Sequence, residues 1–296
     1  SREGRRMTDL RVLAGGLHFA EAPRWHDGEL WFSDFYDYAV KSVDLDGRLR
    51  VRVSMTDRPS GLGWLPDGRL LIVSMTQRSL MRLDGNQLQL HADLAGVATF
   101  HCNDMVVDSL GRAYVGNFGF DLDTAEIDGT LDKVLAEHRG ATLARVDPDG
   151  SVHAVANGLM FPNGTVITPD GSTLIVAESF GRRLTAFDIA ADGSLSNQRL
   201  WADLGRRVPD GICLDADGAI WVANPITPEC FRVAEGGEIL DVIETDNRCF
   251  ACMLGGPDMR TLFMLTSQYS LAVEASIRRT AAVVITEVAV PGAGLP

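Results

Sequence analysis

The chain has 296 residues, 46% hydrophobic and 23% charged, with a formal net charge of −13 at pH 7. This acidic balance argues against nucleic acid and anionic membranes as partners, and no apolar run approaches the roughly 20 residues needed to span a bilayer. Five cysteines without framework spacing are typical of free thiols in a reducing compartment, so we expect a cytoplasmic protein.

The chain begins with a segment, residues 1–10, that lacks the apolar stretch of a signal peptide, and we interpret it as an N-terminal extension. Beyond it the sequence repeats one unit. The clearest copy, Val208 to Asn224, contains two short apolar runs joined at Asp217-Gly218. An Asp-Gly tip between two such runs predicts a β-hairpin, because the turn requires positive φ angles that Gly adopts without strain.

Six copies of this hairpin follow one another along the chain. Their tips are, in order, Gly28, Gly68, Gly111, Gly171, Gly218 and Met259. The spacings between tips are 40, 43, 60, 47 and 41 residues, and a second hairpin follows each of the first five copies. A period of about 40–45 residues with several short strands per repeat is typical of a β-propeller. We therefore predict an all-β fold in which residues 11–296 form a single six-bladed propeller with four-stranded blades. The alternative, a β-sandwich with Gly-rich turns, would not keep this period.

Polar side chains stand in matching register just before the first strand of several repeats. They are Glu21, Asn103, Asn163 and Asp210. Because these strand starts converge on one mouth of a propeller's channel, the four side chains are expected to meet there. An oxygen-only set suits a hard divalent cation such as Ca²⁺, Mg²⁺ or Mn²⁺. The alternative is that Asn and Asp next to Gly only cap turns, but four in register on one rim favour a metal at the channel mouth.

Several short motifs carry a family resemblance. They are Glu21-Ala-Pro-Arg-Trp25, Asn103-Asp104, Phe161-Pro-Asn-Gly164, Pro209-Asp-Gly211, Gly255-Gly-Pro-Asp258 with Thr261-Leu262, and the ending Val290-Pro-Gly-Ala-Gly294. In this order and spacing, the chain resembles the senescence-marker protein (regucalcin)/gluconolactonase/luciferin-regenerating-enzyme-like family of six-bladed propellers.

The resemblance implies one divalent cation held by Glu21, Asn163 and Asp210, with Ca²⁺ as the first expectation and Mg²⁺, Mn²⁺, Zn²⁺ or Fe(II) as alternatives. It also implies a substrate contact from Asn103 and lactone hydrolysis with Asp210 as the base. The residue types agree, since a metal polarises a carbonyl and acidifies a bound water, and a neighbouring carboxylate accepts the proton. Asn103 would either orient the substrate or complete the coordination sphere, and Asp104 is the candidate for a structural role.

One position departs from the family pattern. Many sugar lactonases carry Arg two residues before the Asn that matches Asn103. This chain has His101 there, which is the candidate substrate-binding residue. Imidazole offers fewer donors than guanidinium, and aromatic residues such as Phe118 and Phe161 surround the expected mouth. We therefore predict a preference for apolar or sparsely hydroxylated lactones, unless Arg58 supplies the missing donors. The enlarged third spacing holds residues 120–140, either a lid over the site or a solvated surface segment.

These observations favour a metal-dependent lactonase, a carboxylic ester hydrolase acting on a small-molecule lactone, as a monomer or weak homo-oligomer. The first alternative is a non-catalytic calcium- or ligand-binding regulatory propeller, and the second is a scaffold propeller that binds protein partners. Cys249 and Cys252 form a CxxC motif, but it precedes a propeller strand and not a βαβ unit, which disfavours a redox role.

Overall fold

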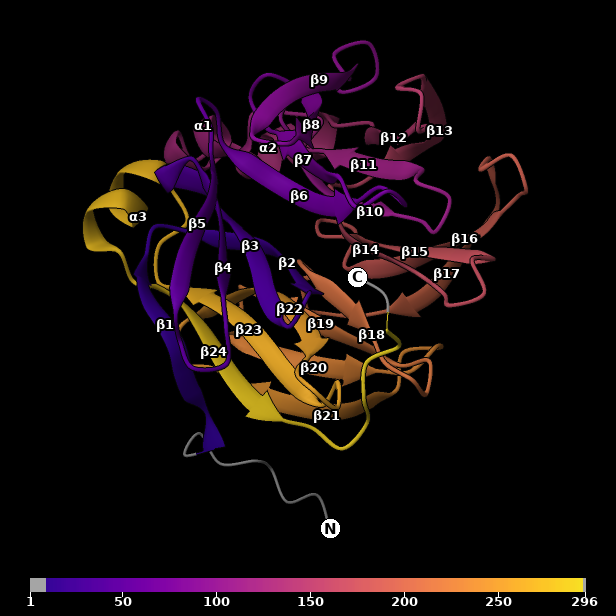
Figure 1. The fold of residues 1–296 in the computed structure, drawn as a ribbon. Coiled ribbons are helices and arrows are strands. Elements are labelled where there is room, and N and C mark those ends of the chain that lie inside the picture. The colour runs from indigo at the N-terminus through magenta and orange to yellow at the C-terminus, as the bar shows by residue number, and fades with distance from the viewer. Residues whose placement is uncertain (1–8, 295–296) are drawn as a thin grey trace.

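The computed structural model describes residues 9–294, which form six four-stranded antiparallel sheets arranged as the blades of a propeller (Figure 1). The innermost strands of neighbouring blades contact one another in a closed cycle around the channel. The six-bladed, four-stranded architecture predicted from the repeat period is therefore confirmed. Of the expected N-terminal extension, residues 1–8 lie outside the described residues.

Each of the first five blades is made of four consecutive strands, the first innermost. Blade 1 contains β2 (Ala20–His26), β3 (Glu29–Asp34), β4 (Ala39–Val43) and β5 (Leu49–Ser54). Blade 2 contains β6 (Pro59–Trp64), β7 (Leu70–Ser74), β8 (Ser79–Asp84) and β9 (Gln87–Asp93). Blade 3 contains β10 (Cys102–Val107), β11 (Ala113–Asn117), β12 (Ala141–Val146) and β13 (Val152–Leu159). Blade 4 contains β14 (Pro162–Ile167), β15 (Thr173–Glu178), β16 (Arg183–Ile189) and β17 (Leu195–Asp203). Blade 5 contains β18 (Ile212–Leu214), β19 (Ile220–Asn224), β20 (Glu229–Val233) and β21 (Ile239–Glu244).

The sixth blade draws on both ends of the chain. Its strands are, from the channel outward, β22 (Arg248–Gly255), β23 (Thr261–Ser267), β24 (Ala281–Glu287) and β1 (Arg11–Leu17). The first strand pairs antiparallel with the last, Leu17 opposite Ala281, and Figure 1 shows the indigo β1 beside the yellow β24. Hydrogen bonds between the two ends of the chain therefore close the ring, which the period alone did not predict.

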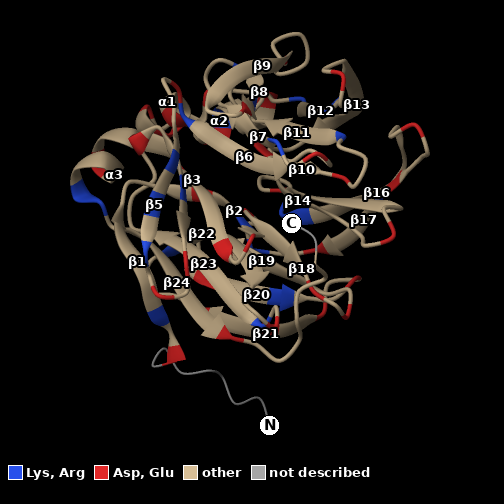
Figure 2. Cartoon of the chain, viewed as in Figure 1, with Lys and Arg blue, Asp and Glu red and all other residues tan. Residues whose placement is uncertain are grey.

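The predicted hairpin tips adopt the backbone that the turn requires. At the first tip Asp27 and Gly28 have φ angles of 50° and 77°. The sixth tip has no Gly at the corresponding position, yet Met259 still takes a left-handed φ of 59°. Acidic residues gather at many of the turns, as Figure 2 shows. At one of them, the carboxylate of Asp44 accepts hydrogen bonds from the backbone N–H of Asp46 and Arg48. Part of the negative charge therefore serves turn formation.

Glycines let the inner strands approach one another closely. A Cβ on Gly164 would lie 2.5 Å from the backbone nitrogen of Ile212, and a Cβ on Gly211 would lie 2.7 Å from the Cα of Ala251. Any side chain at either position would force neighbouring blades apart. The polar residue directly before each of these glycines is consequently brought to the channel mouth.

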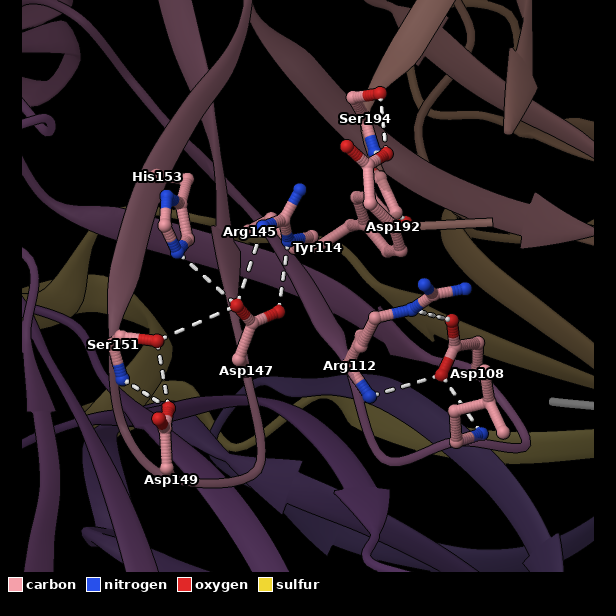
Figure 3. A network of polar contacts seen from close by, with 12 residues as sticks. Asp108, Arg112, Tyr114, Arg145, Asp147, Asp149, Ser151, His153, Asp192 and Ser194 are labelled. Atoms are coloured by element: carbon pink, nitrogen blue, oxygen red, sulfur yellow. Dashed lines mark hydrogen bonds and ion pairs between the residues drawn. The ribbon is translucent and has the colours of Figure 1, made fainter. Parts of the chain in front are cut away.

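Polar contacts join the outer parts of neighbouring blades (Figure 3). The Tyr114 hydroxyl in β11 donates to the carbonyl of Gly193 in the β16–β17 turn at 2.8 Å, which links blades 3 and 4. Within blade 3, Asp147 lies 2.8 Å from Arg145 and 3.1 Å from the ring of His153. This network stabilises the outer parts of blades 3 and 4 and does not include the residues at the inner strand starts.

Short helices decorate the blades. They are α1 (Leu122–Ile127) and α2 (Leu131–Glu137), which interrupt blade 3, α3 (Ala272–Arg278) between β23 and β24, and the one-turn 3₁₀ helix η2 (Phe35–Asp37). The first two occupy the segment expected at residues 120–140, and α3 packs against η2. None of the helices in residues 9–294 is long and apolar enough to cross a membrane.

All five cysteines are buried with free thiols. Burial raises the pKa of the Cys102 thiol to about 12. Burial and the neighbouring thiols of Cys249 and Cys252 raise the pKa of the Cys230 thiol well above its ordinary value. Cys249 and Cys252 of the CxxC motif both lie on β22 in the core. Thiols buried in the core are shielded from reaction partners in solvent, so this environment supports packing and not redox chemistry.

Candidate active site

One cavity of about 180 Å³ brings the four expected oxygen-bearing residues together. Its lining includes Glu21 from β2, Asn103 from β10, Asn163 from β14, and Asp210 from the loop before β18. Glu21 and the two asparagines are each at most 7% exposed. Side chains separated by up to 189 positions in the sequence therefore line one cavity, because inner strand starts of different blades converge there.

Irregular backbone marks the mouth end of the inner strands. The β2–β3 pairing shifts register between Glu21 and Arg24, and Ala22 adopts a φ of 52°. In blade 4, Phe161 has a φ of 65° directly before β14, whose pairing shifts after Pro162. A non-glycine residue with positive φ is held there at a conformational cost, and such residues cluster at functional sites.

The amide of Asn163 has a defined orientation. Its Nδ2 donates to Ser179 Oγ at 3.2 Å, and Ser179 Oγ in turn donates to the carbonyl of Pro209 at 2.7 Å. Because the nitrogen is engaged by this relay, the oxygen Oδ1 is the atom available to the cavity. A carbonyl-type oxygen is a suitable ligand for a hard cation.

Asp210 carries a buried oxygen that lacks a hydrogen bond. Its backbone N–H donates to Ala223 at 2.9 Å, and the next N–H, of Gly211, donates to Phe250 at 2.9 Å, so the main chain is fixed on both sides. The Oδ1 atom has no hydrogen-bond partner among the described residues. A buried carboxylate oxygen without a partner is unfavourable unless a proton or a cation satisfies it.

Burial raises the proton affinity of both carboxyl groups in the cavity. Burial raises the pKa of Asp210 to about 8, and the negative charge of Asp104 adds to the effect. Burial also raises the pKa of Glu21 well above its ordinary value, with further contributions from Asp210 and Asp104. Two acids in one buried site cannot both ionise without a compensating positive charge, so this arrangement favours a bound proton or a cation.

A buried ion pair joins β2 and β10, the strands that carry Glu21 and Asn103. Arg24 Nη2 contacts Asp104 Oδ1 at 2.8 Å, and both side chains are almost fully buried. The same oxygen accepts from the backbone N–H of Met105, and Arg24 Nε donates to the carbonyl of Leu62. Asp104 is thus engaged by internal partners, which agrees with the structural role considered for it.

Aromatic rings form most of the cavity wall. They are Phe19, Phe35, Tyr36, Phe118, Phe161, Phe180 and Phe250. From the sequence, Phe118, Phe161 and Phe180 of blades 3 and 4 were expected near the mouth, but the four rings from blades 1 and 6 were missed. Phe19 and Phe250 contact each other edge to face, with centroids 4.7 Å apart. Phe19 and Phe250 lie near inner strand starts, which was the available signal, although the same pattern also suits ordinary core residues. Phe35 and Tyr36 follow β3 in η2 and carried no such signal.

The inserted segment covers this cavity. Leu122, Asp123 and Glu126 of α1, together with Leu131 of α2, contribute to its lining. A carboxylate oxygen of Asp123 lies 3.8 Å from the guanidinium of Arg58. Of the two alternatives for residues 120–140, the geometry therefore matches the lid.

His101 is not among the residues that line the cavity. Its ring stacks on Phe100, with centroids 4.1 Å apart, and lies 5.7 Å from Phe118, so it packs behind the aromatic wall. Burial and the charge of Arg58 lower its pKa. Its role in substrate binding stays a prediction. A different cation, Arg248, does line the cavity and was not identified from the sequence.

Fold and site together define a six-bladed β-propeller that holds an oxygen-rich, aromatic-walled cavity at the inner strand starts. The family described as the SMP-30/gluconolactonase/LRE-like region matches residues 19–268. The chain belongs to this family, as its short motifs indicated.

Named relatives give the family match its context. Over 269 residues the chain is 26% identical to the pentonolactonase XacC of Haloferax volcanii, covering 88% of this chain and 86% of that protein. It is 26% identical over 200 residues to a 6-deoxy-6-sulfogluconolactonase of Pseudomonas putida, covering 66% of this chain but only 64% of that enzyme. Among solved structures, a calcium-binding protein, regucalcin, from Agrobacterium tumefaciens superimposes with a TM-score of 0.77 at 21% identity, covering 97% of this chain and 96% of that one. This last likeness concerns the fold.

Proposed function

We propose that the protein is a metal-dependent hydrolase that opens lactones or related cyclic esters. The observation that carries the proposal is the buried Oδ1 of Asp210, unpartnered within the described residues, in a cavity that also contains Glu21, Asn103 and Asn163. The family and its lactonase-named members supply the reaction class.

Glu21, Asn163 and Asp210 would hold one divalent cation. Their donor set is oxygen only, which suits Ca²⁺ first and Mg²⁺ or Mn²⁺ next. No group of three or more His, Cys, Asp or Glu side chains within residues 9–294 is placed to bind a metal, so the candidate depends on the carboxamide as a ligand. When bound, the cation supplies Lewis acidity toward a lactone carbonyl and toward water. The calcium-binding relative supports Ca²⁺ as the first cation to test.

The remaining chemistry belongs to side chains of the cavity. Asp210 would accept the proton of the attacking water, because a carboxylate that gives one oxygen to the cation keeps a second oxygen for the proton. The Oδ1 of Asn103 lies 3.5 Å from the hydroxyl of Ser60, which donates to it, so the amide Nδ2 is the group free to contact a substrate oxygen. This favours substrate orientation over metal coordination for Asn103. The aromatic wall and the lid would exclude bulk water and bind an apolar ring.

Metal depletion followed by restoration with single cations tests the proposal. Hydrolysis of a lactone panel should vanish on depletion and return with one of Ca²⁺, Mg²⁺ or Mn²⁺. Asp210→Asn should keep part of its metal affinity and lose about 10²–10⁴-fold in kcat, because an amide coordinates through oxygen but cannot accept a proton. Metal affinity without hydrolysis of any lactone would instead indicate the non-catalytic binding propeller. Normal turnover by Asp210→Asn would exclude the base role.

The lining also bears on specificity. Seven of the residues around the cavity are aromatic, and a hydroxyl buried against them without a partner costs about 1–3 kcal/mol. We expect a higher kcat/KM for an alkyl or aromatic lactone than for gluconolactone of the same ring size. His101→Arg should improve gluconolactone turnover if His101 takes part in recognition. A wild type that strongly prefers gluconolactone, with no gain in the variant, would contradict this expectation.

A further inference from the structure

We propose that Arg248 is a specificity-determining residue, which binds a carboxylate carried by the substrate beside its lactone ring. The inference rests on the proposed function and narrows its substrate class to lactones with one carboxylate substituent and an otherwise apolar body.

Arg248 opens β22, the inner strand of blade 6, and lines the same cavity as Glu21 and Asp210. Two hydrogen bonds hold its guanidinium: Nε donates to the carbonyl of Pro225 at 3.1 Å, and Nη1 donates to Ser270 Oγ at 3.2 Å. Its central carbon also lies 4.9 Å from the centroid of the Phe250 ring. An arginine fixed in three directions has lost most of its conformational freedom before any ligand arrives, which reduces the entropic cost of binding.

The guanidinium keeps unused donors. Within residues 9–294, Nη2 has no hydrogen-bond partner, and no carboxylate oxygen lies within 4.0 Å of the Arg248 nitrogens. Neither of the two acids that the lid adds to the cavity forms an ion pair with Arg248. Asp123 lies 3.8 Å from Arg58. Burial raises the pKa of Glu126 and the charge of Arg248 opposes this rise, without a contact within 4.0 Å between the two groups. Arg248 is therefore a half-buried cation that no carboxylate of the described chain contacts directly, although its charge acts on Asp210 and Glu126 across the cavity.

A substrate carboxylate matches this site best. The guanidinium is permanently charged and planar, and its N–H groups suit the two oxygens of a carboxylate. Aromatic surroundings exclude water and strengthen the attraction compared with a pair on an open surface. A neutral hydroxyl would gain only an ordinary hydrogen bond from the same donors.

A pair of lactones of similar shape tests the assignment on the metal-loaded protein: 5-oxotetrahydrofuran-2-carboxylate, and the neutral analogue with an isopropyl group in place of the carboxylate. Wild type should favour the carboxylate. Arg248→Gln should raise KM for the carboxylate lactone by about 10- to 100-fold with a much smaller change in kcat, since a charge-assisted contact is lost in ground state and transition state alike. Arg248→Lys should recover part of the affinity, because it restores the charge without the planar fork.

Two control variants separate the local contact from general electrostatics. Arg278→Gln removes the same charge from the exposed surface of α3 and should leave the ratio of the two specificity constants unchanged. Glu126→Gln removes a negative charge from the cavity rim and should keep or increase the preference for the carboxylate. A ratio that is the same in Arg248→Gln as in wild type, or that falls equally in Arg278→Gln, would overturn the proposal.

Failure of the proposed function would be visible separately. If wild type hydrolyses neither lactone with any cation, calorimetric binding of tetrahydrofuran-2-carboxylate still probes Arg248 without turnover. Weaker binding of this ring carboxylate by Arg248→Gln than by wild type would support the site. Equal binding by both proteins, or no binding by wild type, would refute it.

Discussion

At the scale of single residues, Ser179 decides which atom of Asn163 faces the cavity. The serine hydroxyl donates to Pro209 and accepts from the Asn163 amide nitrogen, so the amide oxygen is left for a ligand. Asp210 shows the complementary feature, an oxygen that the described chain leaves without a hydrogen bond. Both features favour a cation, because each presents an unshared oxygen in a buried position.

Removing either proposed ligand should weaken metal binding. Glu21→Gln removes a charge and Asn163→Ala removes an oxygen, and we expect at least about a tenfold loss of affinity for each. Calorimetric titration of metal-stripped protein gives the affinity and stoichiometry. Asn86→Ala and Glu235→Gln, at exposed positions, are matched controls that should bind like wild type. Wild-type affinity in both site variants would contradict the assignment.

The carboxyl groups also predict how the metal-free protein responds to pH. The pKa of Asp210 is raised from 3.8 to about 8 by burial and by Asp104, so the folded state binds this proton more tightly than the unfolded chain. Its contribution to stability is therefore fully present below pH 3.8 and is lost as the pH rises to about 8. Between these limits, Tm of metal-free wild type should fall relative to that of Asp210→Asn, which lacks the titrating group. With added cation, Tm should depend on pH in the same way for both proteins. Parallel plots of Tm against pH for the two metal-free proteins would contradict the prediction.

At the scale of elements, glycine and strand irregularity position the site. Gly164 and Gly211 allow inner strands of different blades to approach closely, and the backbone N–H of Gly164 itself donates to the carbonyl of Asp210 at 3.1 Å. Register shifts at the mouth ends of β2 and β14 turn Glu21 and Asn163 toward the cavity. The hairpin that organises each repeat thus also supplies the side chains of the site.

The helical insertion gives a prediction at the same scale. Leu122 and Leu131 line the cavity from α1 and α2, whereas Ile127 on α1 is 70% exposed. Exchanging both leucines for Ser should raise KM for an apolar lactone by about tenfold or more, because apolar contact area with the substrate is lost. Metal affinity should not change. Ile127→Ser is the control, and an equal KM effect from it would show that these helices do not act as a lid.

At the scale of the whole molecule, the ring depends on pairing between the first and last strands. Leu17 at the end of β1 is 1% exposed and packs in the cluster that contains Val283 and Ala281 of β24. Leu17→Ala should lower the free energy of unfolding by about 2–5 kcal/mol, since a fully buried side chain is removed. Val12 on the same strand is 62% exposed, and Val12→Ala should have little effect. Equal urea midpoints for the two variants would argue against a stabilising role for the closure.

Much of this architecture follows from local rules that a sequence expresses directly. Asp-Gly tips specify turns, alternation specifies strands, and a recurring period specifies blades, because each depends on residues close together in the chain. The common register of Glu21, Asn103, Asn163 and Asp210 was also visible, since a propeller repeats one geometry around its axis. The resemblance of the short motifs to the family implied the same four residues.

Other features arise only when distant segments pack. Leu17 of β1 pairs with Ala281 of β24, which lies 264 positions further along the chain, so no local sequence pattern predicts the pairing. His101 has the expected position in the sequence but lies behind Phe118, whereas Arg248 lines the cavity. The sequence by itself determined the blades and the ring of oxygen-bearing side chains, because repeated local geometry places them. Only the tertiary structure decided which aromatic rings, helices and charges surround them, because side-chain direction depends on register shifts and on neighbours from other blades.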